Sequence, residues 1–137
     1  MQLNSSQIGE VTELKCQTFL IEHGYNVLIP IGNYLPYDLV IEKNNKFTKI
    51  QCKHAVEQET GFKVYTKRET RIDGNTKKIL YTSKDCDYFM TEYKNNFYIF
   101  PVYETNETRF WTVPPRNGCK SAKMAKDFLA ENMLQII

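Results

Sequence analysis

Three tight-turn signals constrain the fold of this chain more than any other feature. Asn44-Asn45, Asp73-Gly74 and Asn95-Asn96 each lie between runs of residues typical of strands. Asn, Asp and Gly tolerate the positive φ angles that two-residue hairpin turns require. The sequence therefore predicts three β-hairpins, with paired strands over residues 37–43 and 47–54, 62–72 and 77–82, and 87–93 and 97–102.

Helical patterns stand at both ends of this run of strands. Residues 6–22 carry apolar side chains at near-helical spacing, Ser5 or Ser6 can cap the start, and Gly24 suits the end. A last helix is predicted from a cap at Ser121 to about residue 133. With further strands over residues 25–31 and 109–113, this order indicates an α+β or α/β fold, a mixed sheet flanked by helices. The 137 residues fit one domain, 1–137.

The sequence argues against the membrane and secreted classes of protein. The apolar run over residues 25–31 is far too short to span a bilayer. The first six residues are polar and lack the basic and apolar regions of a signal peptide. We therefore expect an intracellular, cytoplasmic protein.

The four cysteines argue against a zinc site or a disulfide framework. They lie 33 to 36 residues apart, with no C-x-x-C pair and only two histidines in the chain. Reduced and mostly buried thiols are the expected state of Cys16, Cys52, Cys86 and Cys119.

Charge is concentrated in two segments. The net charge is +2, but residues 63–84 hold seven basic and two acidic residues, and residues 109–126 hold five basic residues and no acid. Each segment thus carries +5, against −8 in the remaining chain. A single lysine-rich stretch is usually solvated surface, whereas two such stretches with nearby aromatic residues favour a polyanionic partner.

One group of polar residues can carry chemistry. Asp38 begins one hairpin strand, and Gln51 and Lys53 share one face of its partner because side chains alternate along a strand. Antiparallel pairing across Asn44-Asn45 brings Asp38 near both. A carboxylate and an amide oxygen suit Mg²⁺, and a lysine there can orient water or stabilise charge on a phosphate. The spacing also arises by chance, in which case Asp38 is a turn residue and Lys53 a surface lysine.

Over most of its length the sequence resembles the PD-(D/E)XK nuclease superfamily, and in particular the small branch of intron homing endonucleases and archaeal-type Holliday junction resolvases. The matching segments are residues 8–14 (IGEVTEL), 24–27 (GYNV) with Pro30 and Gly32, 36–41 (PYDLVI), 50–53 (IQCK), 87–89, 97–102 and 114–117. The resemblance implies a restriction-endonuclease-like fold, to which this chain adds a long basic hairpin.

The resemblance also implies the roles of the site residues. Asp38 corresponds to the central metal ligand, Gln51 to the second ligand and Lys53 to the catalytic lysine. Glu13 supplies an acid from the first helix, and the backbone carbonyl of Cys52 a further ligand. Mg²⁺ is the implied cofactor, with Mn²⁺ as a substitute. Gln51 replaces the usual acid, as in some homing endonucleases, and Glu13 restores the second negative charge.

Other residues near the motif have simpler interpretations. Glu10 rivals Glu13, but the spacing of the family's helix acid from Gly9 selects Glu13. His54 is interpreted as a polar residue at a strand end. The Cys52 side chain faces away from Lys53 and is interpreted as core.

The implied reaction is Mg²⁺-dependent hydrolysis of double-stranded DNA by a homo-oligomer, either a dimer or a tetramer. Site-specific cleavage of the homing type is favoured; the alternatives are a Holliday junction resolvase and a DNA-binding module of the same fold that has lost activity. The expected DNA contacts are Lys67, Arg68, Arg71, Lys77 and Lys78 in the hairpin, and Arg116, Lys120 and Lys123 in the second basic segment.

Overall fold

Hairpins account for most of the strands, as the turn signals predicted. The computed structural model describes residues 1–137. Its elements are, in order, α1 (Ser5–Glu22), β1 (Asn26–Leu28), β2 (Leu39–Lys43), β3 (Lys46–Cys52), β4 (Ala55–Gln58), β5 (Gly61–Tyr65), β6 (Lys67–Ile72), β7 (Asn75–Leu80), β8 (Tyr88–Tyr93), β9 (Asn96–Pro101), β10 (Glu107–Trp111), the 3-10 helix η1 (Ala125–Phe128) and α2 (Ala130–Met133).

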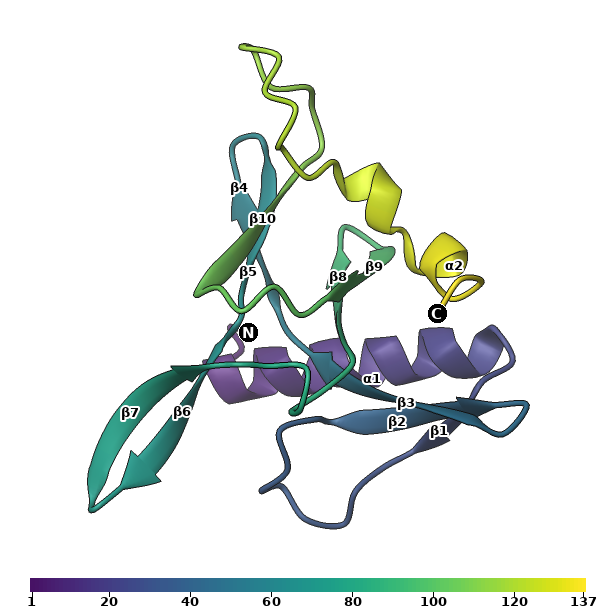
Figure 1. Cartoon of the computed structure of the whole chain (residues 1–137), viewed down its shortest axis with the longest axis vertical. Coiled ribbons are helices and arrows are strands. Elements are labelled where there is room, and N and C mark those ends of the chain that lie inside the picture. Colours follow the sequence, from purple (N-terminus) through teal and green to yellow (C-terminus); the bar gives the residue numbers. More distant parts are fainter.

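The strands form three sheets (Figure 1). The main sheet has the order β1-β2-β3-β8-β9, in which only β3 and β8 run parallel. A smaller sheet has the order β10-β5-β4, and β6 and β7 form a separate two-stranded ribbon, which we call the arm. Helix α1 packs against the main sheet and α2 against β9. The predicted mixed sheet flanked by helices, with a long basic hairpin, is confirmed.

The first helix begins one residue earlier than predicted. Its cap is Asn4, whose side chain accepts a hydrogen bond from the Gln7 N–H at 2.9 Å, while the Gln7 side chain accepts one from the Asn4 N–H at 2.9 Å. This reciprocal capping box satisfies two otherwise unpaired amide groups. Gly24 ends the helix with φ of 85°, as predicted.

The buried face of α1 leaves several of its apolar residues outside the core. Thr12, Cys16 and Leu20, four residues apart, are buried against the sheet. Val11 and Leu14 remain 39% and 54% exposed. This orientation also turns Glu13, the neighbour of Thr12, toward the edge of the sheet where β3 ends.

Two of the three turns are as predicted. Asn44 and Asn45 have φ of 53° and 64°, and Asp73 and Gly74 have φ of 51° and 78°. The third turn lies one residue earlier than predicted, at Lys94-Asn95 with φ of 50° and 66°. The Glu92 carboxylate accepts the Asn95 N–H at 2.9 Å, and this bond fixes the turn there.

The strand predicted over residues 62–72 is divided. Residues 55–58, which lie in none of the predicted strands, form β4, and β4 pairs with β5 through a turn at Glu59-Thr60. After β5 the Thr66 N–H bonds to the Asn106 carbonyl at 2.9 Å, so the arm begins only at Lys67. The strand predicted over residues 25–31 likewise shortens to β1.

The prediction of a single C-terminal helix over residues 121–133 is wrong. Leu129 is extended, with ψ of 129°, and its backbone bridges to Tyr98 of β9. That pairing divides the segment into η1 and α2, and Ser121 caps neither of them. Cross-strand bonding to β9 therefore overrides the local helical pattern.

Two hydrophobic clusters hold these layers together. One lies between the helices and the main sheet and includes Cys16, Leu39 and Ile50; the other joins the main sheet to the smaller one and includes Phe62, Phe89 and Phe100. All four cysteines are free and three are buried, as predicted. None of the helices combines the length and the apolar character needed to cross a bilayer.

Candidate active site

The carboxylate of Asp38 is fixed where β2 begins and β3 ends. The Asp38 N–H donates to the Ile50 carbonyl at 3.0 Å, in register with the Leu39–Ile50 pair. The Asp38 Oδ2 accepts the Cys52 N–H at 3.0 Å. The hairpin register thus brings Asp38 beside Gln51 and Lys53, as the alternation of side chains predicted.

Lys53 is held at the same end of the sheet. Its N–H donates to the Met90 carbonyl of β8 at 2.9 Å, so the backbone is fixed on the side away from β2. The side chain is half-buried. Burial lowers the pKa of Lys53 from its ordinary value, while the nearby Asp38 opposes this shift.

Two acids with raised pKa values meet at this edge. Burial is the main cause for Asp38, where it outweighs the Cys52 N–H bond and the Lys53 charge. Burial also raises the pKa of Glu13, and the negative charge of Asp38 raises it further, with a smaller contribution from Glu10. Two desolvated carboxylates that repel each other create a site in which a bound cation is stabilised.

Gln51 supplies a side-chain oxygen that accepts no hydrogen bond within the protein. Its Oε1 atom is buried and has no hydrogen-bond partner. A buried unsatisfied acceptor is costly and calls for an explanation, and coordination of a cation is one. The donors therefore fit Mg²⁺: two acids, an amide oxygen and the Cys52 carbonyl. No three His, Cys, Asp or Glu side chains converge, so an ion there would rely on Gln51 or the backbone.

The other residues considered near the motif lie either in the core or on the exposed surface. Cys52 is buried, and contact with the Cys16 thiol together with burial raises the pKa of its own thiol. It is therefore a core residue and not a nucleophile. Glu10 and His54 are exposed. Of the two helix acids, only Glu13 is half-buried near Asp38.

Sequence reasoning missed Tyr81, which borders the site. Tyr81 follows β7 directly and is 4% exposed. The Lys53 Nζ atom lies over its ring, 5.0 Å from the centroid. No local pattern marks this tyrosine, because its contact with Lys53 spans the whole arm; the one available signal is its position beside a basic hairpin.

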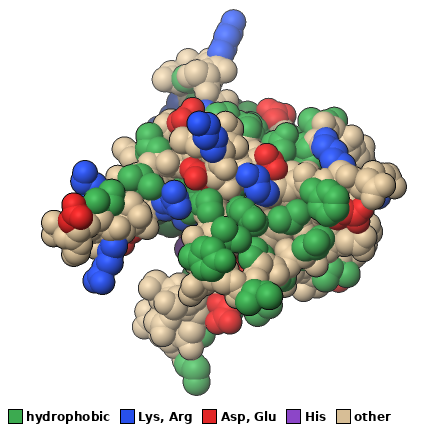
Figure 2. Space-filling view, turned by 60° about the horizontal axis from the view of Figure 1, so that its bottom comes forward, with side chains coloured by type: hydrophobic (Ala, Val, Ile, Leu, Met, Phe, Trp, Pro, Cys, Tyr) green, Lys and Arg blue, Asp and Glu red, His purple; other side chains and the backbone are tan.

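The predicted DNA contacts of the arm divide into two groups. Arg71, Lys77 and Lys78 are exposed on the arm, whose basic side chains project at the left of Figure 2. Lys67 is half-buried. Arg68 is already engaged at the base of the arm, where its guanidinium pairs with the Asp85 carboxylate at 3.5 Å.

The second basic segment, residues 109–126, does not lie beside the arm. Arg116 and Lys120 lie on the exposed loop between β10 and η1, which projects at the end of the long axis opposite the arm (Figure 1). Lys123 is half-buried, with its ammonium 4.6 Å from the centroid of the Tyr103 ring. Of the two segments, only the arm adjoins the acidic site.

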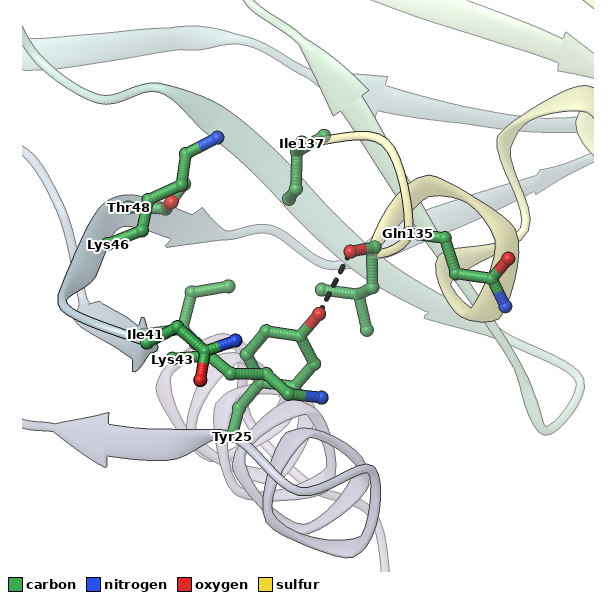
Figure 3. A pocket seen from close by; sticks show the side chains of 9 residues that line it. Tyr25, Ile41, Lys43, Lys46, Thr48, Gln135 and Ile137 are labelled. Atoms are coloured by element: carbon green, nitrogen blue, oxygen red, sulfur yellow. Dashed lines mark hydrogen bonds between the residues drawn. The ribbon is translucent and has the colours of Figure 1, made fainter.

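A cavity of about 530 Å³ occupies the far end of the β2–β3 hairpin. Tyr25, Lys43 and Lys46 are among its lining residues, and the Tyr25 hydroxyl donates to the Leu134 carbonyl at 2.9 Å (Figure 3). Its lining includes no aspartate or glutamate. It therefore lacks the acids that a divalent cation needs, and the candidate site remains the opposite end of the hairpin.

Comparison with known proteins agrees with this architecture. A family model described as PD-(D/E)XK endonuclease matches residues 3–131. Among solved structures, the chain is similar to a bacterial homing endonuclease, I-Ssp6803I, with a TM-score of 0.76 and 21% sequence identity over 98% of this chain and 94% of that one. At this identity the likeness shows a shared fold. No protein of curated function matches.

Proposed function

This chain belongs to the PD-(D/E)XK endonuclease family, and from that premise we propose that it hydrolyses DNA phosphodiester bonds with Mg²⁺, or Mn²⁺ in its place. The observation that carries the proposal is the buried and unpartnered Oε1 atom of Gln51, a residue that the β2–β3 register brings opposite Asp38. Glu13, Asp38, Gln51 and the carbonyl of Cys52 would hold the ion. The bound ion supplies Lewis-acid polarisation of the scissile phosphate.

Lys53 performs the second part of this chemistry. Its ammonium lies at the same edge as Asp38, where it can hold the attacking water by a hydrogen bond and stabilise negative charge that grows on the phosphate. Burial strengthens both effects, because the site has less water to screen charge.

The arm provides the DNA contacts. A two-stranded ribbon fits the major groove of B-form DNA. Arg71, Lys77 and Lys78 are exposed along it, and Lys67 lies at its base. Arg116, Lys120 and Lys123 are contacts of second rank, because they project from another part of the molecule.

The test is nicking of supercoiled DNA by the purified protein. Mg²⁺ should support nicking and EDTA should abolish it. Asp38→Ala and Lys53→Ala should lose nicking, whereas Lys46→Ala, an exposed lysine at the other end of β3, should retain it. Equal cleavage by wild type and both site variants would refute the assignment of the site.

Site-specific double-strand cleavage of the homing type is the favoured form of this activity. The likeness in fold to a bacterial homing endonuclease supports it, as does the arm. Holliday junction resolution is the alternative, supported by the helix acid Glu13 near Asp38. Linear duplexes and four-way junctions offered in parallel distinguish the two. Binding without cleavage in Mg²⁺ and Mn²⁺ would instead indicate an inactive DNA-binding module.

Cleavage of both strands requires at least two copies, because each chain holds one site. We propose a homo-oligomer, a dimer or a tetramer. An exposed hollow beside the site supports this: Ile31, Tyr34 and Phe47 are 107%, 82% and 60% exposed, and no charged residue lines it. Such a surface can face its own copy without charge repulsion, and monomers rarely expose one. Light scattering of wild type and Ile31→Asp tests it; a wild-type monomer would refute it.

A further inference from the structure

Two cations from different parts of the chain share the ring of Tyr81. The Lys53 Nζ atom lies 5.0 Å from the ring centroid, and the Arg68 Cζ atom lies 5.8 Å from it. Lys53 follows β3, whereas Arg68 is the second residue of β6. The aromatic ring is thus a contact common to the acidic site and the arm.

The ring itself is firmly held. Tyr81 is 4% exposed and packs edge-on against Phe89 of β8, with 5.1 Å between the ring centroids. The next residue, Thr82, donates its N–H to Asp85 at 2.8 Å. Asp85 also pairs with Arg68 at 3.5 Å, which closes the base of the arm around the tyrosine.

Lys53 needs such a contact. Its stem has four rotatable bonds, and the half-buried ammonium has lost part of its hydration. An aromatic face attracts a desolvated cation through the ring quadrupole, by an amount that exceeds the attraction at exposed sites. The face of Tyr81 therefore limits the orientations that the ammonium can adopt next to Asp38.

We propose that Tyr81 is a positioning residue that holds the Lys53 ammonium in the orientation required for phosphodiester hydrolysis. This inference rests on the proposed function. The face of the ring orients the ammonium, and this role does not require the hydroxyl group. Because Arg68 of the arm lies against the same ring, the base of the arm is part of the catalytic site as well as of the DNA-binding surface.

The test varies the electrostatics of the ring at constant shape. Tyr81→Phe keeps the negative face, whereas pentafluorophenylalanine at position 81 keeps a similar ring and reverses its quadrupole. We expect kcat of Tyr81→Phe within about threefold of wild type, and kcat of the fluorinated protein about tenfold below that of Tyr81→Phe, with KM unchanged in both. Equal kcat in the two variants, or an equal fall in kcat and rise in KM, would overturn the inference.

A second measurement does not depend on activity. The ring current of Tyr81 should move the ε-methylene proton resonances of Lys53 upfield in wild type and in Tyr81→Phe, and this displacement should disappear in Tyr81→Leu. Resonances at ordinary positions in wild type would overturn the contact itself. If the contact is present but wild type cuts no DNA under any condition, the proposed function fails and the positioning role fails with it, whereas the geometry stands.

Discussion

The β2–β3 hairpin and the arm are built by the same turn chemistry and have opposite surroundings. Both are antiparallel and both turn through two residues of positive φ, Asn44-Asn45 in one and Asp73-Gly74 in the other. β2 and β3 lie inside the five-stranded sheet, between β1 and β8, whereas β6 and β7 pair only with each other. The turn determines that a hairpin forms, and the neighbours determine what it can do.

In the proposed function, this difference separates chemistry from recognition. The Asp38 carboxylate at the end of the buried hairpin is desolvated and held by the Cys52 N–H, and low solvation strengthens electrostatic effects on a reacting group. Basic side chains along the arm remain in water and can contact phosphates without a large cost of desolvation. We therefore expect variants of the two hairpins to affect different measured quantities.

The largest effect is expected from Lys53→Ala. Loss of a charge that acts at the phosphate should slow single-turnover cleavage about 100- to 1000-fold. Affinity for the same DNA, measured with Ca²⁺ in place of Mg²⁺, should change by less than about threefold, because one phosphate contact carries little of the total. Lys46→Ala on the same strand should leave both unchanged. A parallel loss of affinity would contradict the separation of the two hairpins.

Variants of the arm should lose affinity for DNA and keep most of the cleavage rate. Combined replacement of Arg71, Lys77 and Lys78 by Ala should weaken DNA binding about 10- to 100-fold and reduce the slope of log K against log salt by about 3. Cleavage at saturating enzyme should stay within a few-fold of wild type. Lys43→Ala/Lys46→Ala in the other hairpin provides the control. An unchanged slope would remove the arm from the interface.

A smaller effect concerns stability in the absence of metal. Burial raises the pKa of folded Asp38 above its ordinary value of 3.8, so ionisation of Asp38 favours the unfolded chain. Asp38→Asn should therefore raise the free energy of unfolding at pH 7 and eliminate cleavage. The gain should shrink as pH falls through the raised pKa and be absent below 3.8. Urea denaturation across pH measures it; a gain that grows toward low pH would reverse the assigned sign.

The smallest effects compare the two turns directly. Ala is disfavoured at positive φ by about 1 kcal/mol, so Asn45→Ala should lower global stability by roughly that amount. Gly74→Ala should instead loosen only the arm, because no other strand pairs with β6 or β7. Hydrogen exchange should quicken over residues 67–80 in Gly74→Ala, with an unchanged melting temperature. Equal losses of global stability would mean that the arm folds as one unit with the sheet.

Local signals in the sequence identified the parts of this molecule that depend on local physics. The hairpin turns follow from residues that accept positive φ, and the approach of Asp38 to Gln51 and Lys53 follows from the register across Asn44-Asn45.

The predictions are wrong where contacts with residues far away in the sequence determine the local structure. Leu129 leaves the helical conformation to bridge with β9, and α1 turns Cys16 toward the sheet while Leu14 stays exposed. No local pattern marks Tyr81 as part of the site, since its partner Lys53 is 28 residues away in the chain. Single-sequence patterns do not contain such contacts.

The most direct test of the central claim is a crystal of the protein soaked in Mn²⁺, with anomalous diffraction data. We expect an anomalous peak between the Asp38 carboxylate and Gln51 Oε1, which should be absent in crystals of Asp38→Asn. A peak only elsewhere, or no peak in crystals of a protein that cuts DNA with Mn²⁺, would contradict the assignment of this edge of the sheet as the metal-dependent nuclease site.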